Sequence, residues 1–335
     1  MILAGGMSTR LYPLTRRVPK PLVPIAGEPN SAHVLRYLRS FGIEQVAINV
    51  HYLADAIVAA FGDGSRYGVQ LEYLHEPELL GSAGAVKQME HFFDETFVVV
   101  GCDDLTDIPL DAVVAFHRRR RALATIALVS ADDVTQFGVV ILDEAGKIVE
   151  FQEKPAAGTE RSHLVNTGIY VFEPAIFAHI PAATFYDFGK QVFPGLQREH
   201  APFYGIEMPN AYWCDVGTPA EYRRATADVL AGRVRLPGVR PAGVASDAVL
   251  GRDVKLEGAV RVGAHARLGD RVRIIGPSVI GDDCIVADDA VVERSILWDR
   301  ATVGARAQVV DSIVGTDFPI AAEARLDNVV VGWEK

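Results

Sequence analysis

The sequence predicts a layered α/β domain followed by a parallel β-helix. Strand-like and helix-like segments alternate over the first two thirds of the chain, and branched aliphatic residues recur at every sixth position in the last third. Between these parts lies a stretch rich in Gly, Pro and Arg, which is typical of a linker. We therefore predict an N-terminal domain at 1–231, a linker at 232–246 and a β-helix domain at 247–335.

The N-terminal domain has the pattern of a mostly parallel sheet with helical crossovers. Several of its predicted strands are continuous apolar runs, as expected for strands that are covered on both faces. The predicted strands are 1–4, 45–50, 70–74, 97–100 and 123–129, and the predicted helices are 31–41, 54–61, 82–93 and 110–121. Ligands bind beyond the carboxyl ends of such strands, so we expect the site in the loops that follow them.

The C-terminal third carries a hexapeptide repeat. Fourteen aliphatic residues follow the period, with a register slip after Val292 and another after Val309: Leu250, Leu256, Val262, Leu268, Ile274, Ile280, Val286, Val292, Leu297, Val303, Val309, Val314, Ile320 and Leu326. In a parallel β-helix each short strand turns one aliphatic side chain inward and stacks on the next coil. Small residues that follow the aliphatic ones are expected at tight corners. The flat side of the stack predicts assembly, including a homo-oligomer, or regulation.

Composition excludes several classes of protein. The chain has 335 residues, 33 Lys+Arg against 43 Asp+Glu and a net charge of -10, which disfavours a general nucleic-acid binder. No apolar run approaches the roughly 20 residues of a membrane span, and no secretory signal opens the chain. Cys102, Cys214 and Cys284 lie too far apart for a disulfide framework or a metal-spaced set. We therefore expect a cytoplasmic protein with no membrane partner.

The loop after the first predicted strand has the composition of a polyphosphate cradle. It reads Leu3-Ala4-Gly5-Gly6-Met7-Ser8-Thr9-Arg10. The two glycines let successive N–H groups turn towards one anion, the two hydroxyls add donors, and the arginine adds a forked cation. A little further on, Pro19 and Pro21 restrict the chain on both sides of Lys20. This rigidly held lysine is a candidate contact for phosphates in a transition state.

These motifs, taken in order, resemble those of sugar-phosphate nucleotidyltransferases. The resemblance rests on Gly5-Gly6-x-x-Thr9-Arg10-Leu11, Pro19-Lys20-Pro21-Leu22, Leu80-Gly81-Ser82-Ala83-Gly84, Glu153-Lys154-Pro155, Asn166-Thr167-Gly168 and Trp213-Cys214-Asp215-Val216-Gly217. It covers about residues 1–230 and is nearest to bacterial mannose-1-phosphate guanylyltransferases. It implies a Rossmann-like nucleotidyltransferase domain, and the hexapeptide tail resembles the left-handed β-helix of several members.

The resemblance implies a reaction in which a sugar 1-phosphate attacks the α-phosphorus of a nucleoside triphosphate and pyrophosphate leaves. Both reactants are anionic, so catalysis is mainly charge neutralisation and alignment. The implied cofactor is Mg2+, for which carboxylates are natural ligands. By similarity the catalytic residues are Arg10, Lys20, Asp103 and Asp215, and the two aspartates are also the metal ligands.

The resemblance also assigns two sets of binding residues. The nucleotide-binding set is Leu3, Ala4, Gly5, Gly6, Ser8, Thr9, Glu76, Gly81, Ser82 and Ala83. The sugar-phosphate-binding set is Gly138, Glu153, Lys154, Asn166 and Thr167. In the second set Lys154 would hold the phosphate, Glu153 and Asn166 would bind sugar hydroxyls, and Gly138 would allow close backbone approach.

Glu76 favours GTP as the nucleotide. By similarity this position contacts the edge of the base, and guanine presents adjacent N1–H and N2–H donors that suit one carboxylate. Thymine and uracil present one donor between two acceptors, which an amide serves better. The first expectation is GTP with mannose 1-phosphate. The alternatives are glucose 1-phosphate or a cyclitol phosphate, with GTP, UTP, dTTP or ATP.

Single residues bear on other functional classes and mark departures from the family pattern. A non-catalytic regulatory subunit would lack the four catalytic residues, all of which are present; His265 alone is weak support for a β-helix acyltransferase.

The run 117–121 is expected to face solvent at a helix end, and Thr218 to Glu221 to form a capping box. Ser8 replaces a glycine of the family motif, Cys102 replaces another, and the abrupt start at Met1 predicts that residues precede it.

Overall fold

The computed structural model describes residues 1–239 and 242–333, and residues 240–241 of the predicted linker therefore lie outside the described part. The chain divides into two compact units. Unit 1 consists of Met1–Gly6 and Val34–Trp213, and unit 2 consists of Met7–His33 and Cys214–Lys335. Unit 2 thus joins a segment near the N-terminus to the C-terminal third of the chain.

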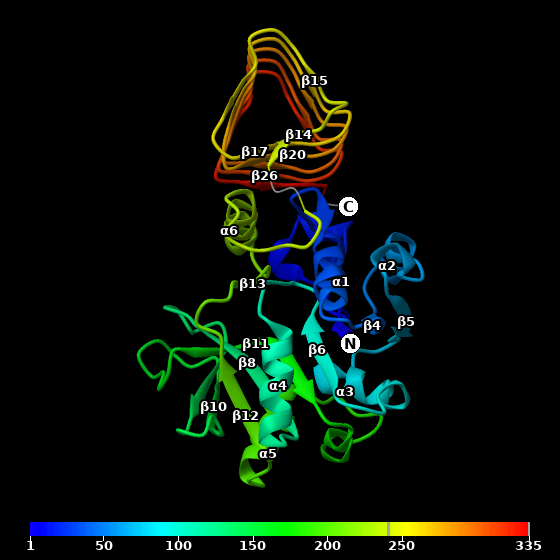
Figure 1. The fold of residues 1–335 in the computed structure, drawn as a ribbon. Helices are drawn as coiled ribbons and strands as arrows, with labels where there is room; N and C mark the ends of the chain where they lie inside the picture. Colours follow the sequence, from blue (N-terminus) through cyan, green and yellow to red (C-terminus); the bar gives the residue numbers. More distant parts are fainter. Residues whose placement is uncertain (240–241, 334–335) are drawn as a thin grey trace. The chain divides into compact units, whose positions relative to one another are not determined.

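One half of the unit 1 sheet is parallel. Strands β1 (Ile2–Leu3), β4 (Gln45–Val50), β5 (Gln70–His75) and β6 (Phe97–Gly101) pair in the order β6-β1-β4-β5. The helices that alternate with them are α1 (Asn30–Ser40), α2 (Ala54–Phe61) and α3 (Gly81–Gln88), labelled in Figure 1. The strands and helices predicted in this half are confirmed to within a few residues, except that α3 ends earlier than predicted.

The other half of the sheet is built around one long strand. Strand β11 (Leu164–Phe172) pairs antiparallel with β6, β8 (Ala124–Ser130) and β9 (Gly138–Leu142). Strand β10 (Ile148–Glu153) pairs antiparallel with β9, and β12 (Phe203–Glu207) runs parallel to β8. Helices α4 (Leu110–Arg120) and α5 (Phe193–Arg198) and the short strands β7 (Asp104–Thr106) and β13 (Trp213–Asp215) follow along the chain. In unit 2, the short strands β2 (Pro24–Ile25) and β3 (Glu28–Pro29) pair antiparallel.

An aromatic cluster fills the core beneath this second half. The rings of Phe172, Phe188, Phe193 and Phe203 are each 3% exposed or less, and neighbouring rings in the series stack with centroids 5.0–5.7 Å apart. Aromatic pairs at such separations add to the stabilisation that burial of their apolar area already provides. The strands that carry sugar-binding candidates therefore rest on a closely packed layer.

The cationic run at the end of α4 is not uniformly exposed. Arg118 to Arg121 face solvent at the helix C-terminus, as predicted, but His117 is fully buried. Its ring nitrogens lie 2.8 Å from Thr125 Oγ1 and 3.1 Å from Glu173 Oε1. Burial lowers the pKa of His117, which favours the neutral ring. The prediction for His117 is wrong because its side chain points back into the core from the last turn of the helix.

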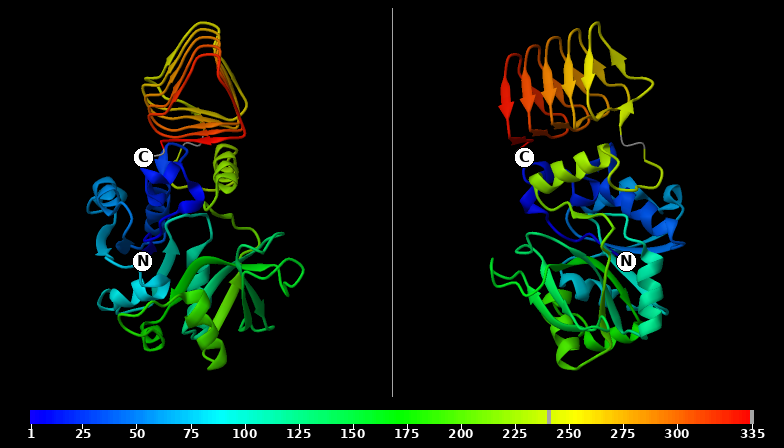
Figure 2. Two further views of the ribbon diagram at one scale, coloured as in Figure 1. Left: turned by 180° about the vertical axis from the view of Figure 1, so that it is seen from behind. Right: turned by 60° about the vertical axis from the view of Figure 1, so that its left-hand side comes forward.

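The C-terminal part of unit 2 is a left-handed parallel β-helix with three flat faces, seen along its axis in Figure 1 and from the side in Figure 2. Successive strands on each face lie one coil apart, as in the pairing of Val262 with Ile280 and of Ile280 with Leu297. The strands are β14 (Gly243–Val244), β15 (Val249–Leu250), β16 (Lys255–Glu257), β17 (Val260–Val262), β18 (Arg267–Leu268), β19 (Arg273–Ile275), β20 (Ser278–Ile280), β21 (Ile285–Val286), β22 (Val291–Glu293), β23 (Ile296–Leu297), β24 (Thr302–Val303), β25 (Gln308–Val310), β26 (Ile313–Val314), β27 (Pro319–Ile320), β28 (Arg325–Asp327) and β29 (Val330–Val331).

The predicted inward positions form the core of the β-helix. Eleven of the fourteen repeat residues are 6% exposed or less, and Leu256 and Leu326 pack against that core. Leu250 is the exception, with 43% exposure. It lies in the first coil, where each strand stacks on one neighbouring strand only, so its inward side chain is covered from one side.

The small residues of the repeat have a different cause from the predicted one. Several corners are formed by non-glycine residues with positive φ, such as His265 and Asp283. The glycines one residue after the aliphatic position are needed because the next coil passes very close. A Cβ on Gly281 would lie 2.7 Å from the backbone nitrogen of Asp299.

We expect Gly281→Ala to destabilise the β-helix by about 1–3 kcal/mol, because the added Cβ meets backbone that cannot move without shifting a coil. Gly195→Ala in α5 is the matched control: nothing lies within 4 Å of its Cβ position. In a helix this change is favourable by up to about 1 kcal/mol. Thermal unfolding followed by circular dichroism measures both variants, and equal melting temperatures would contradict the close approach of the coils.

Candidate functional site

The end of strand β1 is packed tightly against β4 and the loop that follows β5. The N–H of Ala4 donates to Asn49 Oδ1 at 2.9 Å. A Cβ on Gly5 would lie 2.8 Å from Asn49 Nδ2 and 2.9 Å from Leu79 Cδ2, so no other residue fits there without movement. By contrast, nothing lies within 4 Å of a Cβ on Gly6. Packing therefore requires glycine at position 5, whereas position 6 has room for a side chain.

Ser8 adopts the conformation that glycine would supply at its place in the family motif. Its φ is +53°, in the left-handed region. Thr15 supports this turn by donating from Oγ1 to the Ser8 carbonyl at 2.8 Å. Ser8 and Thr9 open the short 3-10 turn Thr9–Leu11, which also carries Arg10. In the predicted phosphate loop, Ser8 thus adopts the positive φ that a glycine would adopt in the family motif.

Unit 2 brings together three of the four predicted catalytic residues. Asp215 Oδ2 lies 3.6 Å from an Arg10 guanidinium nitrogen, and Asp215 Oδ1 lies 3.4 Å from Lys20 Nζ. Both distances exceed the 2.7–2.9 Å that is typical of a charge-assisted hydrogen bond. The arrangement therefore places two cations around one carboxylate without locking them into tight ion pairs, which suits donors that must also bind phosphate oxygens.

Local structure explains how these charges are held. Pro19 is extended and leads into the 3-10 turn Lys20–Leu22, and the Lys20 side chain is 11% exposed. Asp215 ends β13, and Gly217 leaves room beside it, because a Cβ there would lie 2.7 Å from Arg10. Helix α6 (Pro219–Leu230) then begins at the predicted cap: Glu221 N–H donates to Thr218 Oγ1 at 3.3 Å, and that hydroxyl donates to the Glu221 carboxylate at 2.9 Å.

Glu76 is a buried carboxylate, 4% exposed, at the end of β5. Its Oε2 accepts from Asn49 Nδ2 at 2.6 Å, and its Oε1 accepts from the Leu80 N–H at 3.3 Å. Since an ionised carboxylate has about four lone-pair positions, two remain for further donors. Glu76 therefore links the phosphate loop to the start of α3 and keeps acceptor capacity on each oxygen.

The predicted base-binding loop is fastened to a segment about a hundred residues later in the chain. The N–H groups of Ala83 and Gly84 both donate to the Tyr186 carbonyl, at 3.0 and 2.9 Å. Ser82 Oγ donates to Asp187 Oδ2 at 2.9 Å and accepts from the Phe188 N–H at 3.0 Å. The Ser82 hydroxyl is thus used to join these two segments.

Two other predicted sugar-binding residues, Gly138 and Lys154, lie beside Glu153, together with Asp187, Gly189 and Lys190, which were not predicted. A Cβ on Gly138 would lie 3.2 Å from Glu153 Oε2. A Cβ on Gly189 would lie 3.0 Å from the same oxygen and 3.5 Å from Asp187 Oδ1. Partial desolvation by the surrounding protein is the main cause that raises the pKa of Glu153, and the negative charge of Asp187 adds to it. Lys154 and Lys190 act in the opposite direction.

Lys154 and the turn in β11 complete this region of unit 1. Lys154 is exposed and has a φ of +48°, an uncommon conformation for a non-glycine residue and one that is often found at functional sites. Asn166 lies at an irregularity of β11, where its amide donates to the Tyr170 hydroxyl at 3.0 Å. Thr167 is 1% exposed and its hydroxyl donates to the Ala127 carbonyl at 2.8 Å, so its side chain serves the fold.

Asp103 follows β6 at the carboxyl end of a central strand, as predicted. The next residue, Asp104, has structural partners: it accepts from the Gly101 N–H at 2.8 Å and from Trp213 Nε1 at 3.0 Å. Cys102 is buried before it. Asp103 therefore lies just beyond a strand end, next to Asp104, whose carboxylate is hydrogen-bonded to the backbone and to an indole.

Comparison with known proteins identifies the family. Residues 1–232 match the family described as nucleotidyl transferase, and residues 256–334 match the GMPPB C-terminal domain. The chain belongs to the nucleotidyl transferase family. This nucleotidyltransferase is 39% identical to a UTP–glucose-1-phosphate uridylyltransferase of Synechocystis sp., over 94% of this chain and 86% of the relative. It is 34% identical to a mannose-1-phosphate guanylyltransferase of Mycobacterium tuberculosis, over 82% and 78%.

A solved structure supports the same fold. A Bacillus anthracis protein described as a candidate glucose-1-phosphate thymidylyltransferase superposes on the nucleotidyltransferase with a TM-score of 0.61 and 27% identity. The match covers 68% of this chain and 92% of that one. Among the residues that the structure describes, no helix is long and apolar enough to cross a membrane.

Sequence reasoning missed two residues that contact the candidate site residues of the nucleotidyltransferase. Asn49 is a polar residue inside the apolar strand β4, 4% exposed, and its side chain connects Ala4 with Glu76. Asp187 caps the turn that follows it by accepting from the Lys190 N–H at 3.1 Å. The available signals were the polar Asn49 in an apolar strand and Asp187 two residues before a glycine. Neither signal shows which residues these side chains contact.

Titration of Glu153 tests this local electrostatics directly. Asp187→Asn should lower the pKa of Glu153, because it removes a negative charge that disfavours ionisation. Lys190→Gln should raise that pKa, because it removes a positive charge that favours ionisation. The side-chain carboxyl resonances of 13C-labelled glutamate, followed against pH, measure both shifts. Shifts of the same sign in the two variants would contradict the arrangement of charges around Glu153.

Proposed function

We propose that this nucleotidyltransferase transfers the guanylyl group of GTP to mannose 1-phosphate and releases pyrophosphate. The observation that carries the proposal is the cluster of Arg10, Lys20 and Asp215, which supplies two cations beside a carboxylate for a reaction between two anions. The choice of sugar and base is supported by the match of the C-terminal domain to that of GMPPB and by the guanylyltransferase relatives.

The residues divide the work between binding and charge neutralisation. In unit 1, the backbone of the loop at Gly5 and Gly6 and the start of α3 would hold the nucleotide, and Lys154 and Glu153 would hold the sugar phosphate. In unit 2, Arg10 would neutralise the departing pyrophosphate, and Lys20 would bind the phosphate at which bonds form and break. Alignment of two bound anions and removal of their repulsion are the main contributions available to such an enzyme.

Asp103 and Asp215 would hold a magnesium ion whose remaining ligands come from the substrates and water. Asp103 and Asp215 provide carboxylate oxygens, which hard divalent cations prefer. No group of three His, Cys, Asp or Glu side chains that could hold a metal occurs among the described residues, and Mg2+ usually keeps several water and phosphate ligands. When bound, the ion would supply Lewis-acid polarisation of the phosphates.

The acceptor capacity of Glu76 supports guanine. Both carboxylate oxygens already accept one hydrogen bond from Asn49 or Leu80, which orients the group, and each can accept another. Guanine offers two adjacent donors for such a pair of acceptors. An amide at position 76 would turn a donor towards the Asn49 amide or the Leu80 N–H, so the present partners favour a carboxylate over an amide at this position.

A second candidate is uridylyl transfer to glucose 1-phosphate. The relative with 39% identity over 94% of the chain carries that name. The two candidates share all catalytic residues and differ only in the base and the sugar. An assay of pyrophosphate release with Mg2+, each of four nucleoside triphosphates and each of the two sugar 1-phosphates separates them by the ratio of kcat/KM values.

Asp103→Ala should lower kcat for pyrophosphate release by about 10³-fold or more, because a lost metal ligand removes several kcal/mol of transition-state stabilisation. Asp94→Asn, an exposed acidic position in the same unit, is the control and should stay within twofold of the unsubstituted enzyme. Circular dichroism should show that both variants are folded. Retention of a tenth or more of the activity in Asp103→Ala would exclude its proposed role.

Glu76→Gln should reduce the preference for GTP over UTP by about tenfold, since one bidentate contact with a carboxylate is worth about 1–3 kcal/mol. The readout is the ratio of kcat/KM values for the two nucleotides, measured with one preparation. A general distortion of the loop lowers both values together and leaves the ratio unchanged. An unchanged ratio would therefore show that Glu76 supports the loop but does not read the base.

A further inference from the structure

A buried chain of hydrogen bonds connects the β-helix, α6 and the segment that follows Lys20. The Tyr222 hydroxyl of α6 donates to the Pro24 carbonyl at 2.5 Å, and Trp298 Nε1 donates to the same hydroxyl at 2.9 Å. Tyr222 is 0% exposed and Trp298 is 2% exposed. Because an indole nitrogen can only donate, the phenol oxygen must accept from it, which directs the phenol proton to Pro24.

This hydroxyl joins the two chain segments that carry the reacting charges. Pro24 lies four residues after Lys20, and the turn between them is closed by the Val23 N–H donating to the Lys20 carbonyl at 3.1 Å. Tyr222 lies seven residues after Asp215, in the first turn of α6, where its N–H donates to the Thr218 carbonyl at 2.8 Å. Both connections are short and hydrogen-bonded, so movement of the Tyr222–Pro24 contact is passed on to Lys20 and Asp215.

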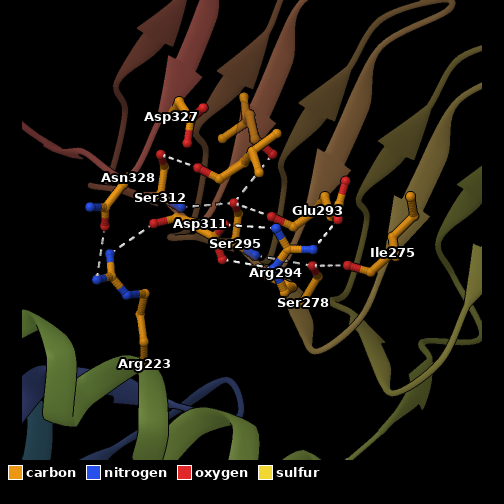
Figure 3. Close-up of polar contacts among 12 residues, drawn as sticks. Arg223, Ile275, Ser278, Glu293, Arg294, Ser295, Asp311, Ser312, Asp327 and Asn328 are labelled. Carbon is orange, nitrogen blue, oxygen red and sulfur yellow. Dashed lines mark hydrogen bonds and ion pairs between the residues drawn. The ribbon is translucent and has the colours of Figure 1, made fainter.

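The β-helix also holds α6 through the residue next to Tyr222. Arg223 donates to the Asp311 carbonyl at 2.8 Å and to Asn328 Oδ1 at 3.1 Å, as Figure 3 shows. The Asp311 carboxylate is in turn paired with Arg294 through two contacts of 2.8 and 2.7 Å. Successive coils are linked beneath them by a ladder of buried serines at 278, 295 and 312.

The loop before Lys20 rests on the same end of the β-helix. A Cβ on Gly315 would lie 3.5 Å from Leu14, and a Cβ on Gly332 would lie 3.5 Å from Pro13. The guanidinium of Arg17 lies 5.6 Å from the ring centroid of Trp333. The last coils of the β-helix thus contact the segment of Arg10 and Lys20 on one side and α6 on the other.

We propose that Tyr222, oriented by Trp298, is a positioning residue for nucleotidyl transfer and sets the separation of Lys20 and Asp215. A fully satisfied buried network favours one arrangement of the groups attached to it. A displacement of about 1 Å in a group that aligns the reactants can cost about 10²-fold in rate. The proposal rests on the proposed function, because it takes Lys20 and Asp215 as the reacting charges. It gives the β-helix an indirect part in catalysis, through the position of Lys20 and Asp215.

Tyr222→Phe removes the hydroxyl and keeps the ring, and it should lower kcat about tenfold with KM for both substrates within twofold. Tyr37→Phe is the matched control, because the Tyr37 hydroxyl is also buried and donates to a backbone carbonyl, that of Ile108, at 2.8 Å in unit 1. The control should keep its kcat within twofold while losing comparable thermal stability. Trp298→Phe leaves the Tyr222 hydroxyl in place and should lower kcat by about threefold.

A double substitution separates positioning from a loss of folded protein. In a Lys20→Ala background, Tyr222→Phe should lower the remaining kcat by less than twofold, because the charge to be positioned is gone. A purely structural effect would again lower kcat about tenfold and would overturn the proposal. So would a single Tyr222→Phe variant with unchanged kcat. An unsubstituted enzyme that releases no pyrophosphate with any nucleotide would instead overturn the proposed function, and the positioning role with it.

Discussion

The contact of Asp215 with Arg10 and Lys20 is the interaction that the packing of unit 2 holds in place. It joins residues that are 195 positions apart in the chain, at 3.4 Å between Lys20 Nζ and Asp215 Oδ1. Such a contact cannot hold two distant segments by itself, because partly exposed ion pairs contribute little stability. The segments are held instead by burial, by Tyr222 between them and by the β-helix beside them. Because these contacts are weak, Arg10 and Lys20 can leave Asp215 and bind phosphate oxygens at a small cost in free energy.

The β-helix is well suited to such support because its geometry is repetitive and stiff. Each coil hydrogen-bonds to the next along three faces, and the inward aliphatic residues form one continuous core. A residue on the last coils therefore has little freedom to move relative to the stack. The same stiffness explains why Gly281 must remain small and why Leu250, at the first coil, is left partly exposed.

Unit 1 shows how the candidate recognition residues are held in place by other side chains. Asn49 orients Glu76, and Asp187 connects the base-binding loop to the region of Glu153. The contact between Ser82 and Asp187 means that the predicted nucleotide and sugar sets share a support. A relative named for uridylyl transfer and another named for guanylyl transfer are 39% and 34% identical to this chain.

The sequence by itself determined the features that follow from local pattern. These are the repeat of the β-helix, the alternation of β4, α2 and their neighbours, the cap at Thr218 and the ordered motifs of the family. The domain boundaries at 231 and 246 stay a prediction. Only the tertiary structure decided the burial of His117, the position of Asp187 and the link from Trp298 through Tyr222 to Pro24. Those contacts join residues far apart in the chain, and a side chain's partners there depend on the path of the whole backbone, which no local period encodes.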